Sequence, residues 1–229
     1  MSRNFSFAIG EYYHIYNRGV DKRIIFEDID DRNRFMMLLY LCNGDKPVDI
    51  AKLFEEGKGS TFSDVLSLDR GQELVAIGAY VLMPNHFHIL IKEEKENGIS
   101  KFMSKLSTGY TMYFNSKRSR SGSLFEGRFR ARHIENDQYL KYLFAYIHLN
   151  PIKLTDPAWK ENGIKDREKA ESFLHNYSYS SYFDFMGSSR PQKSLLALVS
   201  FPSYFSSIGS FSSFINDWLF YKDLYDGKG

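Results

Sequence analysis

Two hydrophobic periods recur between residues 12 and 150. Strand-type runs of β-branched, aromatic and alternating residues predict strands at 12–17, 73–83, 86–92 and 125–134. Apolar positions three and four apart predict helices at 28–42, 99–115 and 137–150. Pro84-Asn85 is turn chemistry and joins the second and third strands as a hairpin. This order predicts an α+β, ferredoxin-like (RRM-like) fold: a four-stranded antiparallel sheet with helices packed on one face.

Two segments fall outside this regular order. Residues 43–71 contain four glycines and a proline and are expected to be an insertion, in which 48–56 could form two helical turns. The tail beyond residue 155 is rich in aromatic residues and serine, with a short helix predicted at 211–221. We therefore expect a catalytic-type core over residues 1–155 and a C-terminal aromatic and helical extension, 156–229, packed on that core.

Composition narrows the class of protein. With 43% hydrophobic residues in 229, the chain has ample material for a core and is not a mainly disordered protein. Its single cysteine, Cys42, cannot form an internal disulfide, and no stretch resembles a signal peptide or a bilayer-spanning run. We expect a cytoplasmic protein with no membrane role.

The net charge of +2 hides a basic stretch between residues 101 and 133, which carries eight lysines and arginines against the single acid Glu126. Such a stretch could bind a polyanion. The alternative is that it forms a basic surface exposed to solvent. On the predicted fourth strand, Arg128, Arg130 and Arg132 would share one face. The candidates for phosphate contacts are Lys117, Arg118, Arg120, Arg128, Arg130 and Arg132, with structural salt bridges an equal explanation for any one of them.

The segment VLMPNHFHILIK, residues 81–92, places two histidines on one predicted strand. Residues two apart on a strand point the same way, so His86 and His88 would present their imidazoles together while Phe87 enters the core. Two imidazoles can supply two ligands of a metal site. Such a site needs a third protein ligand and leaves positions for water or substrate. The alternative is an ordinary polar strand face.

The last predicted helix contains YLKYLFAYIHLN, residues 139–150. Tyr142, Tyr146 and Asn150 are four residues apart and form one stripe, which could place an amide oxygen at a metal and a phenol one turn away. His148 lies on another side of the helix and is interpreted as structural. Ordinary core packing is the alternative for each tyrosine. With a metal polarising a phosphodiester, a tyrosine oxygen could attack phosphorus and form a phosphotyrosine link with release of a 3′-hydroxyl.

Four ordered segments carry a resemblance to a known family: YYHIYNRGVDKRIIF (12–26), AYVLMPNHFHILIK (79–92), GSLFEGRFRARHI (122–134) and AYIHLNPIKL (145–154). Together they resemble the REP-associated tyrosine transposases, bacterial relatives of the HUH single-tyrosine insertion-sequence transposases. The resemblance implies that His86 and His88 form the HUH motif, that Tyr146 is the nucleophile and that Asn150 is the third metal-binding residue. It also implies Mg²⁺ or Mn²⁺ and cleavage of single-stranded DNA beside a short hairpin, by a monomer or a homodimer.

Three functions are compatible with these features. The first is a metal-dependent DNA-nicking and strand-transfer enzyme, a transposase-like endonuclease. The second is a non-catalytic protein that binds single-stranded or hairpin nucleic acid on the same fold. The third is a metal hydrolase of small phosphoesters, for which Glu94 would lie roughly 20 Å along the strand from His88. We rank the enzyme first and expect its activity to fall below about pH 6, as the imidazoles protonate.

Overall fold

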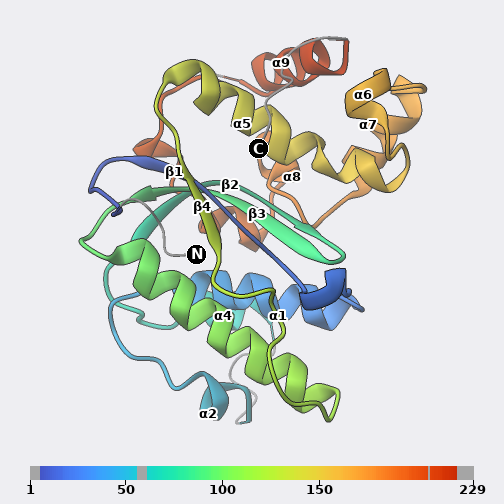
Figure 1. Cartoon of the computed structure of the whole chain (residues 1–229). Helices are drawn as coiled ribbons and strands as arrows, with labels where there is room; N and C mark the ends of the chain where they lie inside the picture. Colours follow the sequence, from blue (N-terminus) through green and yellow to red (C-terminus); the bar gives the residue numbers. More distant parts are fainter. Residues whose placement is uncertain (1–5, 56–60, 206, 221–229) are drawn as a thin grey trace.

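The computed structural model describes residues 6–55, 61–205 and 207–220. Its centre is a four-stranded antiparallel sheet in the order β2-β3-β1-β4 (Figure 1). The strands are β1 (Tyr12–Arg18), β2 (Val75–Met83), β3 (His86–Glu93) and β4 (Arg130–His133). The three long helices of the core are α1 (Ile29–Leu41), α4 (Gly98–Lys117) and α5 (Asp137–Leu149). The predicted α+β fold class is confirmed.

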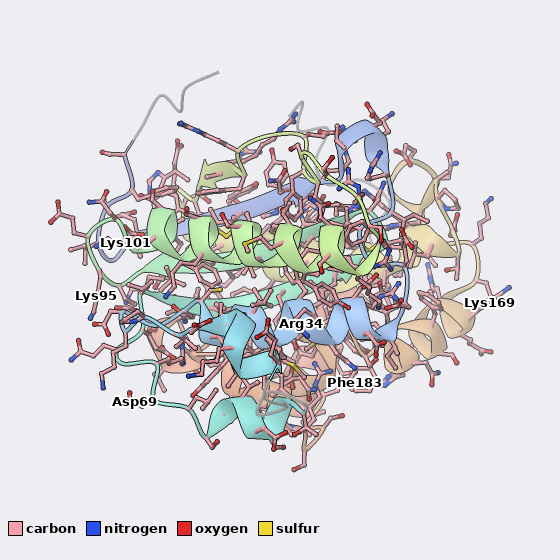
Figure 2. All side chains as sticks on the ribbon, turned by 90° about the horizontal axis from the view of Figure 1, so that it is seen from below. Arg34, Asp69, Lys95, Lys101, Lys169 and Phe183 are labelled. Atoms are coloured by element: carbon pink, nitrogen blue, oxygen red, sulfur yellow. The ribbon has the colours of Figure 1, made fainter. Side chains whose placement is uncertain are left out.

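The alternation of side chains along the strands builds two cores. Ile15, Phe87 and Ile89 point to one face of the sheet and pack with residues of α1 and α4. Leu90 and Val81 point to the other face and pack with residues of α5. Figure 1 shows α1 and α4 below the sheet and α5 above it, and Figure 2, seen from below, shows α4 and α1 side by side across the lower face. The expected packing of helices on one face holds for α1 and α4, whereas α5 differs from it and covers the opposite face.

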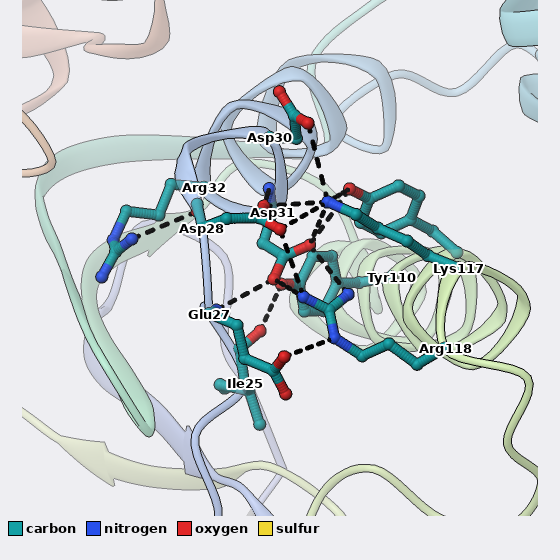
Figure 3. A network of polar contacts seen from close by, with 10 residues as sticks. Ile25, Glu27, Asp28, Asp30, Asp31, Arg32, Tyr110, Lys117 and Arg118 are labelled. Carbon is teal, nitrogen blue, oxygen red and sulfur yellow. Dashed lines mark hydrogen bonds and ion pairs between the residues drawn. The ribbon is translucent and has the colours of Figure 1, made fainter.

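A polar network ties the start of α1 to the end of α4 (Figure 3). Asp28 caps α1 by accepting a hydrogen bond from the Asp31 amide at 3.0 Å. The Asp31 carboxylate is fully buried and accepts from Arg118 at 2.6 Å and from Lys117 at 3.2 Å. Burial opposes the charge of Lys117 and is the largest single cause, but the hydrogen bonds to Asp28, Tyr113 and Asp31 together outweigh it and raise the pKa of the ammonium. The two cations at this helix end thus have a structural role.

The fourth strand is shorter than predicted. Phe125 forms only an isolated bridge, to Gly19, and the regular ladder with β1 begins at Arg130. Between them Gly127 adopts a φ of 142°, a conformation that a side chain would disfavour, and the chain leaves the sheet there. The prediction of a continuous strand over 125–134 was wrong, because alternation in the sequence does not reveal a glycine that bends the backbone away.

The insertion between α1 and β2 is closed at its base by two side chains. Asn43 donates to the Val75 carbonyl at 2.9 Å and accepts from the amides of Leu74 and Val75. Arg70 donates to the Asn43 carbonyl at 2.6 Å. Between these anchors lie two short helices, α2 (Ile50–Glu55) and α3 (Phe62–Leu66). Position 56, where the predicted helical turns end, lies outside the described residues.

The C-terminal segment packs along β2 and over α5. It contains η2 (Asn150–Leu154), α6 (Trp159–Asn162), α7 (Arg167–Asn176), α8 (Tyr182–Phe185), η3 (Pro191–Leu195), η4 (Leu198–Ser200) and α9 (Ile208–Phe220). The Leu82 amide donates to Tyr179 at 2.9 Å and the Ala197 amide donates to Ile77 at 2.9 Å, so this segment covers the outer edge of β2.

The described part of this segment therefore shares the core of the sheet, while the division of the chain at residue 155 stays a prediction. The tail helix predicted at 211–221 corresponds to α9, and Tyr221 lies outside the described residues. Among the helices that the structure describes, none is both long and apolar enough to cross a bilayer.

Candidate active site

The structure brings four of the predicted site residues together on the face of the sheet that α5 covers. His86 and His88 lie on β3 with ring centroids 5.0 Å apart and ring planes nearly perpendicular, at 87°. The Tyr146 ring of α5 lies edge-on to His88, with centroids 5.3 Å apart. Asn150 caps the end of α5 one turn further on, near enough to act on the pKa of both His86 and Tyr146. Two imidazoles, a phenol and an amide thus meet at one place.

The hydrogen bonds of the two imidazoles indicate which ring nitrogens could bind a cation. Asn85 donates its amide Nδ2 to the Lys22 carbonyl at 3.1 Å, which orients its Oδ1 toward His86. That oxygen is 2.6 Å from His86 Nδ1, so Nδ1 carries the proton and donates. His88 Nδ1 is 2.9 Å from His14 Nε2 on β1. In both histidines Nε2 is therefore the nitrogen that could serve as a ligand.

His86 is kept neutral by its surroundings. Burial lowers the pKa of His86 to about 4, and the positive charges of Lys153 and Arg18 act in the same direction. A metal ligand must be unprotonated, so this shift extends the pH range in which His86 could bind a cation. The expected loss of the neutral form near pH 6 does not apply to this residue, because the expectation used the pKa of an exposed imidazole.

Asn150 provides the test of whether these residues fit a metal ion. Its side chain is fully buried, yet neither Oδ1 nor Nδ2 makes a hydrogen bond of normal geometry with a described residue, and its polar influence on His86 and Tyr146 comes from looser contacts. An unpaired buried amide is costly, and in native proteins it calls for an explanation such as an ion. The described residues contain no group of three or more His, Cys, Asp and Glu side chains that could hold a metal. A site of two imidazoles and one amide oxygen accounts for both observations and leaves positions for water and phosphate.

Tyr146 belongs to an aromatic stripe along α5. Its ring is 5.9 Å from that of Tyr142, which is 5.8 Å from that of Tyr139. Burial raises the pKa of the Tyr146 phenol, which therefore holds its proton at neutral pH. His148 points to another side of the helix, where its fully buried ring meets Ser181 at 2.7 Å. Its position agrees with the structural role predicted for it.

The predicted phosphate contacts divide into two groups. Register pairs Tyr16 with Arg130 and His14 with Arg132, so these two exposed arginines lie on the face that carries the histidines. The guanidinium of Arg132 lies over the Tyr139 ring at 4.5 Å. Arg128 is exposed but precedes β4, so it does not share the strand face as predicted.

The second group lies on the opposite side of the sheet. Lys117 and Arg118 are bound by acidic residues of α1, as described above, and Arg120 donates to Asn115 and to the Ser123 carbonyl at 3.2 Å. The structure does not bring these three cations to the histidines. Charge counting grouped them with the site because they are close in sequence, whereas α4 carries them to the other face.

Two further residues of the site were missed from the sequence. His14 was part of a predicted strand, but only the pairing of β1 with β3 brings it to His88. Lys153 is half-buried, and burial lowers the pKa of its ammonium, an effect that the charge of Glu161 opposes. Its position in η2, three residues after Asn150, was a possible signal, since residues three apart in a 3₁₀-helix lie on the same side.

Part of the chain matches a known protein family. Residues 51–150 match the family model described as "Transposase IS200 like". The match covers fewer than half of the 229 residues but includes both histidines, Tyr146 and Asn150. Over this part of the chain it confirms the resemblance to insertion-sequence transposases.

Two other comparisons add no argument about the site. Among solved structures, the chain is similar to one described as "Structure of the REP associates tyrosine transposase bound to a REP hairpin". The sequence identity is 14%, the likeness covers 84% of this chain and 89% of that chain, and the TM-score is 0.47. No curated protein matches this sequence. The assignment of site residues therefore depends on the geometry of this chain.

Proposed function

We propose that the protein is a metal-dependent single-stranded DNA endonuclease and strand transferase that forms a 5′-phosphotyrosine link at Tyr146. The observation that carries this proposal is the meeting of Tyr146 with His86, His88 and Asn150 on one face of the sheet. The match of residues 51–150 to the transposase family supports it.

His86, His88 and Asn150 would hold the cation. A divalent ion such as Mg²⁺ or Mn²⁺, when bound, supplies Lewis-acid polarisation of the scissile phosphodiester. His86 and His88 offer Nε2 because their Nδ1 atoms are engaged with Asn85 and His14. Asn150 offers its carbonyl oxygen, which makes no hydrogen bond of normal geometry with the described residues.

Tyr146 is the proposed nucleophile. Its Oη would attack phosphorus while the bond from phosphorus to the 3′ oxygen breaks, and the leaving oxygen takes up a proton as the phenol loses its own. Because burial raises the pKa of this phenol, proton loss must accompany the attack. The charges of Lys153 and Arg18, which act on the neighbouring His86, would stabilise the negative phosphate. The ester is conserved in the link, so a later 3′-hydroxyl can reverse the step and join strands.

The surface beside the site suits an unpaired DNA strand. Arg130 and Arg132 would contact phosphates, and the partly exposed rings of Tyr139 and Tyr142 would stack with bases. Hairpin DNA, such as a REP-like palindrome, is the proposed substrate context. Tyr146 meets His88 of the same chain at 5.3 Å between ring centroids, so one chain contains all the proposed groups and a monomer can act with its own tyrosine.

The decisive test is a covalent adduct assay with single-stranded oligonucleotides that flank a hairpin, analysed on denaturing gels. The wild-type protein with Mn²⁺ is expected to form the adduct, and Tyr146→Phe or EDTA is expected to abolish it. Tyr40→Phe is the matched control, since that tyrosine lies on α1 and its hydroxyl donates to the Leu66 carbonyl, at 3.3 Å, away from the histidines.

Two results would change the proposal. An adduct that persists in Tyr146→Phe and disappears in Tyr142→Phe would move the nucleophile one turn along α5. DNA binding that is equally tight in EDTA, with no adduct from any variant, would make the protein a non-catalytic binder of single-stranded or hairpin DNA.

A further inference from the structure

His14 is a buried histidine in the middle of β1, outside the set of residues that the sequence assigns to the site. We infer that His14 is a positioning residue that sets the tautomer of His88 and thereby makes His88 competent to bind a cation. This inference rests on the proposed function, because it concerns the same cation site. It adds a residue from β1 to the groups supplied by β3 and α5.

The contact between the two rings is close and protected from water. His14 Nε2 and His88 Nδ1 are 2.9 Å apart, and the ring planes are stacked at 28° with centroids 5.0 Å apart. The relative exposures of His14 and His88 are only 7% and 6%, so the rings are largely withdrawn from solvent. A hydrogen bond in such surroundings is stronger than one in water, and losing either partner is costly.

The proton shared by the two rings can take one of two positions, on His88 or on His14. When both rings are neutral, the 2.9 Å contact holds one proton. If the proton is on His88 Nδ1, then His88 Nε2 carries a lone pair and can bind a cation. If the proton is on His14 Nε2, then His88 carries its own proton on Nε2 and cannot bind. The tautomer of His14 therefore decides whether His88 is a ligand.

His86 differs from His88 in this respect. The Asn85 oxygen that faces His86 can only accept, and its orientation is held by the bond from Asn85 Nδ2 to the Lys22 carbonyl. His86 is thus restricted to one tautomer by an amide. His88 faces a histidine, which can donate or accept, so its tautomer is the variable element of the site.

The rings around the pair hold it in place. Tyr16 contacts both histidines, at 4.9 Å from His14 and 5.7 Å from His88 between ring centroids. Tyr146 lies edge-on to both, at 5.8 Å and 5.3 Å. Reorienting either imidazole would disturb the proposed nucleophile, so the geometry favours exchange of a proton over movement of a ring.

The experiment measures tautomers and metal affinity in the full chain. Imidazole ¹⁵N NMR of the metal-free wild-type protein is expected to show His88 protonated at Nδ1 and unprotonated at Nε2. His14→Phe keeps an aromatic ring but removes the acceptor, so His88 is expected to shift toward the Nε2-protonated form. The Kd for Mn²⁺ should then rise about 10- to 100-fold, the usual effect of losing the partner of a ligating histidine.

Two variants separate positioning from packing. His14→Gln restores an acceptor oxygen near the position of Nε2 and is expected to restore both the His88 tautomer and most of the Mn²⁺ affinity. His148→Phe replaces another buried histidine that faces away from the site, and it should leave the Kd for Mn²⁺ unchanged.

The inference is overturned if wild-type His88 carries its proton on Nε2, or if His14→Phe binds Mn²⁺ as tightly as the wild-type protein. If His14→Phe does not fold, the wild-type spectrum and His14→Gln decide the question. The proposed function would fail on a different result: a wild-type protein that binds no Mn²⁺ and forms no adduct. In that case the NMR spectrum would still report the tautomers of the two histidines.

Discussion

Asn150 offers a test in which removing a proposed metal ligand should stabilise the protein. Its buried amide has two polar atoms without hydrogen-bond partners among the described residues. An unsatisfied buried polar group costs about 1–3 kcal/mol, and leucine has nearly the same shape without the polar atoms. Asn150→Leu should therefore raise the free energy of unfolding of the metal-free protein by about 1–3 kcal/mol. For a chain of this size that is about 2–4 °C in Tm for each kcal/mol.

Asn43 is the matched control, because it is also a buried asparagine but fully hydrogen-bonded. It makes three bonds to the backbone of Leu74 and Val75, at 2.9, 3.1 and 2.9 Å. Asn43→Leu would leave those backbone groups unpaired, at about 1–3 kcal/mol each, and should strongly lower the Tm. The change from asparagine to leucine should therefore raise the Tm at position 150 and lower it at position 43.

Thermal unfolding in EDTA and in excess Mn²⁺ measures both effects. Wild-type protein and mildly destabilised variants should show a higher Tm with Mn²⁺, by linkage of binding to folding. Asn150→Leu should show a raised Tm in EDTA and a much smaller response to Mn²⁺. A Tm in EDTA that falls as far as that of Asn43→Leu, or a full response to Mn²⁺, would refute the interpretation of the unpaired amide as a ligand.

Three further outcomes follow from the contacts described. Arg132→Gln should weaken binding of single-stranded DNA and reduce the slope of log K against log salt by about 0.7, measured by fluorescence anisotropy at several salt concentrations. Arg118→Met should leave the salt slope of DNA binding unchanged. It should lower the free energy of unfolding by roughly 3 kcal/mol in urea titrations, because buried Asp31 loses its guanidinium partner. An altered salt slope would instead place Arg118 on the DNA-binding surface. Burial lowers the pKa of His148 to about 3, so between about pH 6 and 3 the unfolded state binds a proton that the folded state does not. The free energy of unfolding should therefore fall by up to about 1.4 kcal/mol for each unit by which the pH is lowered in this range. His148→Phe should flatten this part of the curve of stability against pH, and an unchanged curve would contradict the assigned burial.

Local pattern was sufficient for most elements and for part of the site. The period of two placed His86 and His88 on one face of a strand, and the period of four placed Tyr146 and Asn150 on one side of a helix. These relations hold within a single element, so they depend only on backbone geometry. The order of the elements then restricted the topology, because few arrangements connect a strand, a helix, a hairpin, a helix and a strand.

Relations between elements were decided by the tertiary structure. His14 and His88 are separated by 74 residues, and their contact depends on the register between β1 and β3. Lys117 and Arg118 pair with acids about 90 residues earlier because α1 and α4 share a face. A register is selected by the packing of both faces of a sheet together, so no window of sequence contains it. The sequence by itself determined which side chains could take part in the site, and packing decided which of them meet.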